Sequence, residues 1–221
     1  MNHPIRWRIA QHFEQYWWRR YLYGKDWPTY HTWKCGYWNN LLDKAIGLAP
    51  ELGLILDQPQ HILDAGCGPA GIYMVLDKHT VTAIDPLLDT YGQWLEHFKP
   101  TSYPWASFRN LPLELFKTRE PFNVVFCMNA LNHVADIHLA TEKLVAATVS
   151  GGYIIMTLDV HNYSAMQKLF RLVPGDILHP HQYTLEGYLE LFISHGLELQ
   201  GNLTLRPGRL FGHELLVFKK L

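Results

Sequence analysis

Short apolar runs alternate with helical stretches along the chain from residue 60 onward. Five runs have the length of buried strands: HILDAG (61–66), TVTAID (80–85), YPWASF (103–108), FNVVFCMN (122–129) and GYIIMTLD (152–159). The stretches between them include helical patterns over 71–78, 88–97 and 138–149. This alternation predicts βαβ units, and therefore a parallel sheet covered by helices on both faces.

The last part of the chain has a different pattern. Two strand-like runs, HGLELQGNLTLR (195–206) and HELLVFKKL (213–221), are separated only by the turn PGRLFG. A tight connection of this kind joins antiparallel strands. We therefore expect an antiparallel pair at the end of an otherwise parallel sheet.

The first 45 residues form a distinct aromatic segment, with six of the eight tryptophans and five of the twelve tyrosines. Apolar residues recur every four positions from Ile9 to Tyr21, and every three or four positions from Tyr30 to Ala45, on either side of the sequence KDWPT. This spacing predicts two amphipathic helices. We interpret residues 1–45 as a helical cap and residues 46–221 as the main domain.

Composition narrows the class of protein. With 221 residues, 48% of them hydrophobic, and a formal charge of −1, the chain suits one globular unit without a general attraction to nucleic acid. Cys35, Cys67 and Cys127 form no C-x-x-C motif, which argues against a disulfide framework or a thiolate zinc site. We find neither a secretory leader nor an apolar run that spans a bilayer, and we expect a cytoplasmic protein.

A glycine-rich turn, ILDAGCGPAG, follows the first predicted strand. Its spacing G-x-G-x-x-G is typical of dinucleotide-binding loops, but Asp64 precedes the first glycine by two residues. A carboxylate there repels a pyrophosphate and attracts an ammonium or a sulfonium. Asp85 ends the second strand, where an acidic side chain accepts hydrogen bonds from ribose hydroxyls. Together these residues indicate an adenosine-containing cofactor, and Asp85 alone does not distinguish a nicotinamide nucleotide from a methyl donor.

The order of DAGCGPAG, AIDP, FNVVFCMNALNHVAD and GGYIIMTLD resembles the class I S-adenosylmethionine-dependent methyltransferases, in particular small-molecule enzymes with a D-x-G-C-G loop. The resemblance covers roughly residues 40 to 221. It implies an α/β, Rossmann-like fold: a seven-stranded, mostly parallel sheet with a reversed last strand, helices on both faces and here an N-terminal helical lid. The reversed strand agrees with the terminal pair inferred above.

The resemblance also implies the cofactor, S-adenosyl-L-methionine, and the residues that bind it. Asp64, Gly66 and Gly68 would line its methionine end, Asp85 would hold the ribose, and Pro86 with Leu87 would flank the adenine. Asn129 would lie beside the methionine portion. The family often has an acidic residue after the third strand, where this chain has Ser107 and Phe108, so only the Phe108 backbone is available for adenine. The implied cofactor-binding residues are Asp64, Gly66, Gly68, Asp85, Pro86, Phe108 and Asn129.

A histidine-rich stretch follows the fifth strand, where open α/β sheets bind ligands. A neutral histidine is a natural general base near pH 7, and our candidates are His161 and His181, with His133 third. Two alternatives remain open. The histidines His179 and His181 could fix the loop around Pro180 by hydrogen bonds, or H-x-H with nearby aspartates could bind a metal, although we predict none.

We predict a methyltransferase that acts on an oxygen or nitrogen atom of a small apolar or aromatic acceptor. The expected substrate pocket contains Trp33, Tyr37, Asp159 and His179, with the aromatic helices as its lid. A nucleic-acid substrate is disfavoured because NALN lacks the N/D-P-P-Y/W type of motif after the fourth strand. The alternatives are an NAD-type oxidoreductase and a non-catalytic binding or partner protein with a methyltransferase fold. The sequence does not define the oligomeric state.

Overall fold

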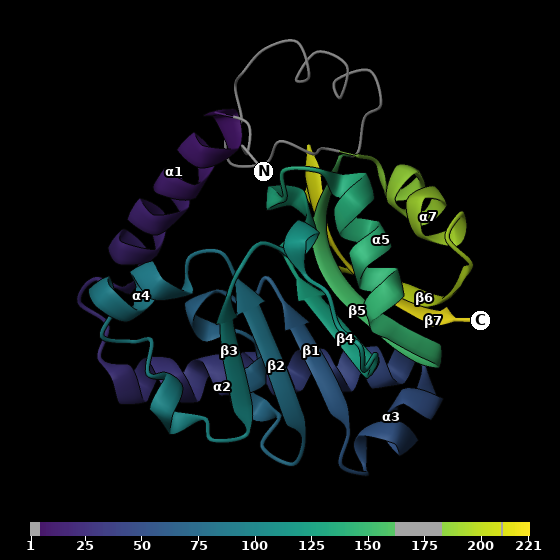
Figure 1. Ribbon diagram of the computed structural model, residues 1–221, viewed down its shortest axis with the longest axis horizontal. Helices are drawn as coiled ribbons and strands as arrows, with labels where there is room; N and C mark the ends of the chain where they lie inside the picture. Colours follow the sequence, from purple (N-terminus) through teal and green to yellow (C-terminus); the bar gives the residue numbers. More distant parts are fainter. Residues whose placement is uncertain (1–4, 162–182, 209) are drawn as a thin grey trace.

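The computed structural model describes residues 5–161, 183–208 and 210–221, which form one seven-stranded sheet (Figure 1). The strands, in spatial order, are β3 (Ala106–Asn110), β2 (Thr80–Asp85), β1 (His61–Ala65), β4 (Phe122–Met128), β5 (Thr148–His161), β7 (Phe211–Lys220) and β6 (Leu197–Arg206). Strands β1 to β5 pair in parallel, whereas β7 is antiparallel to both of its neighbours. The predicted fold class, including the antiparallel C-terminal pair, is confirmed.

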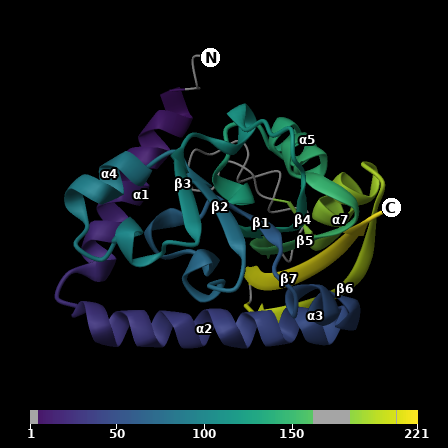
Figure 2. The ribbon, with the colours of Figure 1, turned by 60° about the horizontal axis from the view of Figure 1, so that its bottom comes forward.

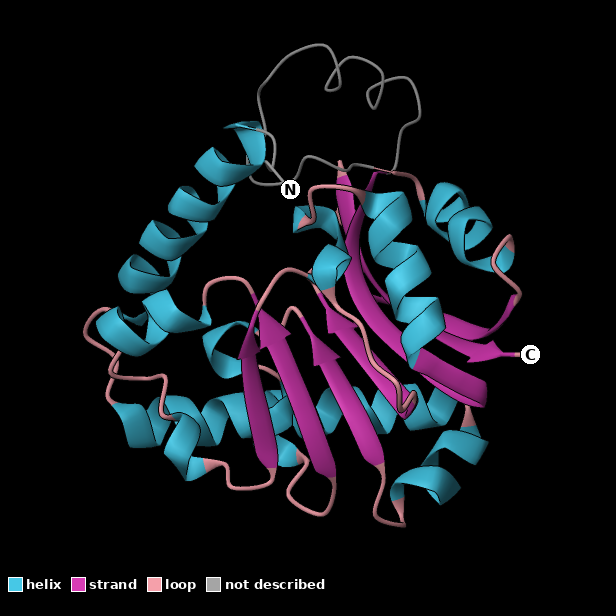
Figure 3. Cartoon of the chain, viewed as in Figure 1, coloured by secondary structure: helices cyan, strands magenta, loops and turns pink. Residues whose placement is uncertain are grey.

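Helices cover both faces of this sheet, as Figures 1 and 3 show. The helices are α1 (Ile5–Leu22), α2 (Trp27–Leu48), α3 (Pro50–Leu56), α4 (Leu88–Trp94), α5 (Ile137–Ala147) and α7 (Leu185–Ile193). One core joins α2, α3 and α4 to one face, and a second core joins α5 and α7 to the other. Strands β1, β2, β4 and β5 are therefore buried on both faces, which explains their nearly continuous apolar sequences, whereas the edge strand β3 is largely exposed.

The second N-terminal helix is the longest of the described helices and extends beneath the sheet (Figure 2). It begins inside the KDWPT sequence, because the Asp26 side chain accepts a hydrogen bond from Thr29 N and Pro28 occupies the first turn. Its buried positions include Tyr30, Trp38, Leu41 and Ala45. The boundary that we expect between residues 45 and 46 falls within this helix.

The first helix does not bury the predicted stripe. Ile9, Phe13 and Trp17 are 41%, 50% and 48% exposed, whereas Ala10 is buried and Trp18 packs against the core. The helix is therefore rotated relative to our prediction, because its neighbours lie on the other side. None of the helices in the described ranges combines the length and apolar character that a membrane span requires.

Three predicted boundaries are wrong. The stretch 71–78 is not an α-helix but contains a 3-10 turn, Ile72–Val75, because Gly71 is extended between two short turns. Strand β3 continues to Asn110, two residues beyond the predicted end, because it pairs with β2 as far as Asp85. The helix expected over 88–97 ends at Trp94.

Candidate functional site

The glycine loop follows β1 and is tied to the end of β2. The backbone N–H groups of Gly66 and Cys67 both donate to Ile84 O, at 2.8 and 3.0 Å. Gly66 and Gly68 have φ angles of +72° and +56°, in the left-handed region that favours glycine. A Cβ at Gly66 would lie 2.3 Å from the Ala130 Cβ. The loop therefore needs glycine both for its conformation and for its contact with the segment after β4.

Asp85 holds the same loop from the end of β2. Its carboxylate accepts hydrogen bonds from Gly68 N at 3.0 Å and Leu87 N at 2.8 Å. Burial raises the pKa of Asp85 to about 7, and the negative charge of Glu14 on α1 adds to this shift. The side chain thus shapes the loop and the turn before Pro86, and its buried charge favours a hydrogen-bond donor.

Asp64, in β1, is the more exceptional carboxylate. It is fully buried, and its Oδ2 accepts a hydrogen bond from Tyr73 N at 3.1 Å. Its Oδ1 has no hydrogen-bond partner among the described residues. Burial raises its pKa to about 7, the charge of Asp85 adds to the shift, and Lys34 opposes it. A buried carboxylate with an unsatisfied oxygen favours binding of a positively charged or hydrogen-bond-donating group.

Gly71 explains how the backbone comes so close to Asp64. A Cβ at this position would lie 2.5 Å from Asp64 Oδ2 and 2.5 Å from Cys67 O. The third glycine of the motif therefore serves the packing of the loop on its carboxylate rather than the first turn of an α-helix.

Lys34 faces this region from α2. Its Nζ lies 4.3 Å from the Trp38 ring centroid and 4.7 Å from that of Tyr37, so both rings stabilise its charge. Burial lowers the pKa of Lys34 to about 8, and Asp64 opposes this shift. A basic group and an acidic group thus border the same space.

That space is a cavity of about 750 Å³ between the N-terminal helices and the carboxyl ends of the strands. Helices α1 and α2 contribute aromatic walls, and the glycine loop and the ends of β4, β5 and β7 supply polar groups. Its lining includes Trp17, Tyr37, Trp38, Asp64, Asn129, Asp159 and His213. The volume is of the size that encloses a small-molecule ligand, roughly 300–1,000 Å³.

Asn129 marks the point where β4 ends beside this cavity. It has a φ of +53°, and it is the one non-glycine residue with positive φ in the described ranges. Its N–H donates to Thr157 O at 2.8 Å, which ties it to β5. Strained backbone of this kind is concentrated at functional sites, and its position agrees with the predicted role of Asn129.

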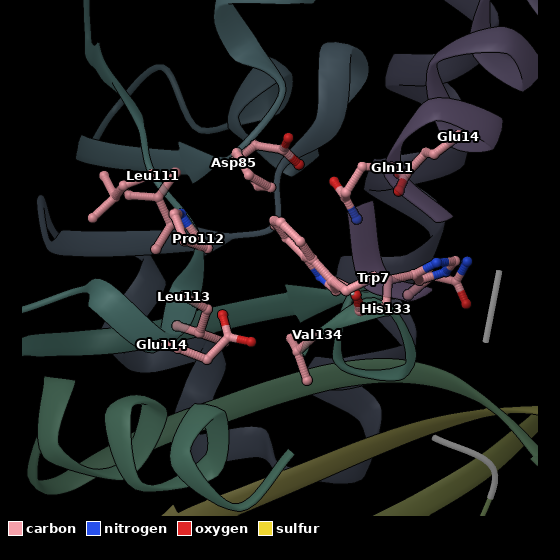
Figure 4. Close-up of a pocket in the computed structure, with 15 residues that line it drawn as sticks. Trp7, Gln11, Glu14, Asp85, Leu111, Pro112, Leu113, Glu114, His133 and Val134 are labelled. Carbon is pink, nitrogen blue, oxygen red and sulfur yellow. The ribbon is translucent and has the colours of Figure 1, made fainter. Parts of the chain in front are cut away.

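A second, smaller cavity of about 60 Å³ lies beyond Asp85 (Figure 4). Figure 4 shows Trp7 reaching from α1 into the space bordered by Asp85, Pro112 and Val134. The indole Nε1 donates to His133 O at 3.0 Å. Trp7 therefore lines the same small cavity as Pro86, beside which the resemblance implies that adenine binds.

The structure brings most of the predicted site residues together. The larger cavity is lined by Tyr37, Asp64, Gly66, Gly68, Asn129, His133 and Asp159, and the smaller one by Gly66, Asp85, Pro86, Asn129 and His133. Residues from the glycine loop, from the ends of β2, β4 and β5 and from α2 thus line the two cavities.

Three predicted residues lie elsewhere. Phe108 packs between Tyr73 and Phe98, with ring centroids 4.9 and 5.5 Å away, because β3 continues past it. Leu111 and Pro112, which follow the actual strand end, line the smaller cavity instead. His161 is buried, and its ring centroid lies 4.3 Å from that of Phe211. Trp33 is stacked on Tyr37 and does not line the larger cavity.

His179 and His181 lie outside the described residues. Among the residues that the structure does describe, no group of three or more histidine, cysteine, aspartate or glutamate side chains is arranged to hold a metal ion.

Sequence reasoning missed several residues of these cavities. Composition identifies Trp7 and Trp18 only as part of an aromatic segment, although their spacing of eleven residues places them on one helix face. His213 had no sequence signal, because its proximity to Asp159 depends on the register of β7 against β5. Its Nδ1 lies 2.8 Å from Asp159 Oδ1.

Comparisons with known proteins agree with this geometry. Residues 63–156 match the family model described as a methyltransferase domain. No curated protein is similar enough to this chain to match it.

Solved structures with the same fold share little sequence with the chain. One is the N-methyltransferase NodS from Bradyrhizobium japonicum WM9 in complex with S-adenosyl-L-homocysteine: TM-score 0.59, 13% identity, covering 84% of this chain and 86% of that one. Another is a putative sarcosine dimethylglycine methyltransferase from Galdieria sulphuraria: TM-score 0.63, 13% identity, covering 81% and 86%. A third is the [4+2]-cyclase SpnF: TM-score 0.60, 14% identity, covering 82% and 80%.

The family match covers β1 to β5 and contains Asp64, the glycine loop, Asp85 and Asn129. The sheet order, with β7 inserted between β5 and β6, differs from that of dinucleotide-binding domains. Residues 63–156 thus match a methyltransferase domain, and the chain shares its fold with solved methyltransferase structures, one of them in complex with S-adenosyl-L-homocysteine.

Proposed function

We propose that this protein transfers the methyl group of S-adenosylmethionine to an oxygen or nitrogen atom of a small, apolar or aromatic acceptor. The observation that carries the proposal is Asp64, a fully buried carboxylate with an unsatisfied oxygen at the wall of the larger cavity. A cationic methyl donor satisfies this carboxylate, whereas a pyrophosphate would be repelled.

The cofactor would extend across both cavities. Its methionine end would lie against Asp64, the glycine loop and Asn129, and its ribose would lie at Asp85, where both carboxylate oxygens already accept backbone N–H groups. A carboxylate oxygen accepts more than one hydrogen bond, so ribose hydroxyls are compatible with this arrangement. Adenine would lie beside Pro86, which requires the indole of Trp7 to move.

The acceptor would occupy the rest of the larger cavity. Trp17, Tyr37 and Trp38 provide aromatic surface there, and Lys34 provides a positive charge. S-adenosylmethionine supplies an electrophilic methyl group, so the chain itself mainly has to hold the acceptor in line and exclude water. We propose residues 1–45 as the cap that does so.

Calorimetry with S-adenosylmethionine, S-adenosylhomocysteine and NADH tests the cofactor. We expect the wild type to bind the two sulfur ligands and not to bind NADH. We expect Asp64→Asn to weaken binding of the sulfur ligands by about tenfold or more, because this is the scale of a lost hydrogen bond to a charged group. Asp57→Asn, at an exposed helix end, is the matched control. Binding of NADH without any response to the sulfur ligands would overturn the proposal in favour of an oxidoreductase.

The remaining alternative is a protein that binds the cofactor without transferring its methyl group. The fold alone does not exclude this, since the structure of a [4+2]-cyclase shares it. Methyl transfer from radiolabelled cofactor to a panel of phenols and aromatic amines distinguishes the two. Tight cofactor binding with no transfer to any member of the panel would favour the non-catalytic alternative.

A further inference from the structure

A histidine and a carboxylate form a close pair at the wall of the larger cavity, outside the predicted set of catalytic histidines. His213 Nδ1 lies 2.8 Å from Asp159 Oδ1, and both residues line the cavity. Their side chains are 15% and 25% exposed. The two residues face each other across adjacent strands, β5 and β7, in register. Rigid strands, rather than a loop, therefore hold the pair in place.

The carboxylate defines which ring nitrogen is available. Asp159 accepts a hydrogen bond from Nδ1, so Nδ1 carries the proton of the neutral ring and Nε2 has the free electron pair. Asp159 also stabilises the ring once Nε2 has taken a proton. This is the arrangement of an oriented general base.

The pair lies at the far end of the cavity from Asp64. Asp64 pairs with Phe126, and Phe126 pairs with Ile155, four residues before Asp159. Asp159 therefore lies two strand spacings across the sheet from Asp64 and four residues further along β5. Together these steps correspond to a separation of roughly 16 Å. A methyl donor held at Asp64 and an aromatic acceptor held at His213 therefore fit between them.

The surroundings favour an acceptor that becomes negatively charged. Arg206 Nη2 lies 3.9 Å from Asp159 Oδ1, so the positive charge of the guanidinium group lies beside the His213–Asp159 pair. The other charged residues that line the cavity are Glu14, Lys34, Lys44 and Asp64. A hydroxyl group must lose its proton to attack a methyl group, whereas a neutral amine already has its lone pair, so a base in this place is most useful to an oxygen acceptor.

We propose that His213, oriented by Asp159, is the general base for a phenolic acceptor; this inference rests on the function proposed above. His213 Nε2 takes the phenol O–H proton as the oxygen attacks the methyl carbon. The carbon–sulfur bond breaks and its electron pair stays on sulfur. The products are an aryl methyl ether, S-adenosylhomocysteine and an imidazolium, which then releases its proton to water. Asp159 is a positioning residue, and Tyr37 and Trp38 provide the aromatic wall.

The test uses 4-nitrophenol as the probe, because its absorption spectrum reports loss of its hydroxyl proton without turnover. We expect 4-nitrophenol to bind to protein saturated with S-adenosylhomocysteine and to ionise below its own pKa. His213→Asn should abolish this ionisation, and Asp159→Asn should reduce it at least severalfold. His195→Asn, at the end of α7, is the matched control and should behave as wild type. Ionisation that persists in His213→Asn would overturn the proposal, as would failure of the probe to bind.

Two further measurements distinguish failure of the proposed function from failure of the inference about His213. Calorimetry of each variant with S-adenosylhomocysteine reports folding and the cofactor site: if the wild type does not bind it, the proposed function fails, whereas normal binding without ionisation defeats the inference about His213 alone. Long-range ¹H–¹⁵N spectra of the wild type report the tautomer directly. We expect the Nδ1–H form of His213, and the Nε2–H form would contradict the proposal even if His213→Asn does not fold.

Discussion

The indole N–H of Trp7 donates a hydrogen bond to the carbonyl oxygen of His133, 126 positions later in the chain, at 3.0 Å. This contact ties α1 to the turn after β4 and holds the indole beside Asp85 and Pro112 (Figure 4). Only about 60 Å³ remains there. One side chain of the N-terminal helix therefore borders the narrow space in which we propose that the adenine of the cofactor binds.

We expect Trp7→Ala to bind S-adenosylhomocysteine more tightly than the wild type, by roughly threefold to tenfold, because a closed conformation that must open reduces the apparent affinity. Calorimetry measures the change. Ile5→Ala, on an exposed turn of the same helix, is the control and should bind as the wild type does. Weaker binding by Trp7→Ala would show instead that the indole packs against the bound cofactor.

The parts of the fold that the sequence predicts are those with a strong local signal. Buried parallel strands have continuous apolar runs, and the fixed spacing of the glycine loop places Asp64 in the first strand and Asp85 at the end of the second. Phe108 was misplaced because the polar end of β3, Arg109 and Asn110, has no apolar signal and is defined only by pairing with β2. The 3-10 turn after Gly71 was missed because its apolar residues Ile72 and Tyr73 also fit a helix.

Contacts between distant segments account for the other errors. The buried face of α1 could not be predicted from periodicity, because the helix has apolar residues on two sides and its neighbours decide which side is buried. His213 and Asp159 are 54 positions apart, and only the register of β7 against β5 brings them together. This pairing joins two strands that are separated in the sequence by α7 and β6, so no local pattern indicates it.

The two buried carboxyls predict that the cofactor-free protein loses stability as the pH rises. Burial raises the pKa of Asp64 and of Asp85 to about 7, above the values in the unfolded chain. The folded state therefore binds protons more tightly, and the stability gained in this way is present near pH 4 and is lost as the pH rises through about 7. We expect the Tm to fall between about pH 5 and about pH 8 and Asp64→Asn to reduce the slope.

Asp57→Asn again serves as the exposed control, and thermal unfolding followed by circular dichroism measures the slope. The cofactor should have the opposite pH dependence, because ionised Asp64 attracts its positive charge: affinity for S-adenosylmethionine should rise through about pH 7. An equal slope in wild type and Asp64→Asn would mean that Asp64 is not the group responsible.

The lowered pKa of Lys34 predicts that its contribution to folding stability changes with pH in the direction opposite to that of Asp64 and Asp85. Burial lowers the pKa of Lys34 to about 8, so the folded state disfavours its protonated form and loses stability as the pH falls through about 8. Lys34→Met keeps a similar shape without the charge, and we expect its stability relative to wild type to increase as the pH is lowered from about 9 to about 6. Lys44→Met, at an exposed lysine of the same helix that borders the cavity beside Asn40, is the matched control in the same denaturation experiments. A constant difference between Lys34→Met and wild type across this range would contradict the assignment.

The glycine loop offers a test of close packing that is separate from backbone strain. Gly66 and Gly24 both have positive φ angles, but a Cβ at Gly66 would lie 2.3 Å from the Ala130 Cβ, whereas a Cβ at Gly24 meets nothing within 4 Å. Gly24→Ala should therefore cost only the left-handed conformation, about 1 kcal/mol of unfolding free energy. Gly66→Ala should cost about 3 kcal/mol, because overpacking adds to the same strain. Adding Ala130→Gly removes the atom that clashes, so the double variant should recover most of the difference in urea denaturation, and no recovery would mean that the cost of Gly66→Ala comes from the backbone alone.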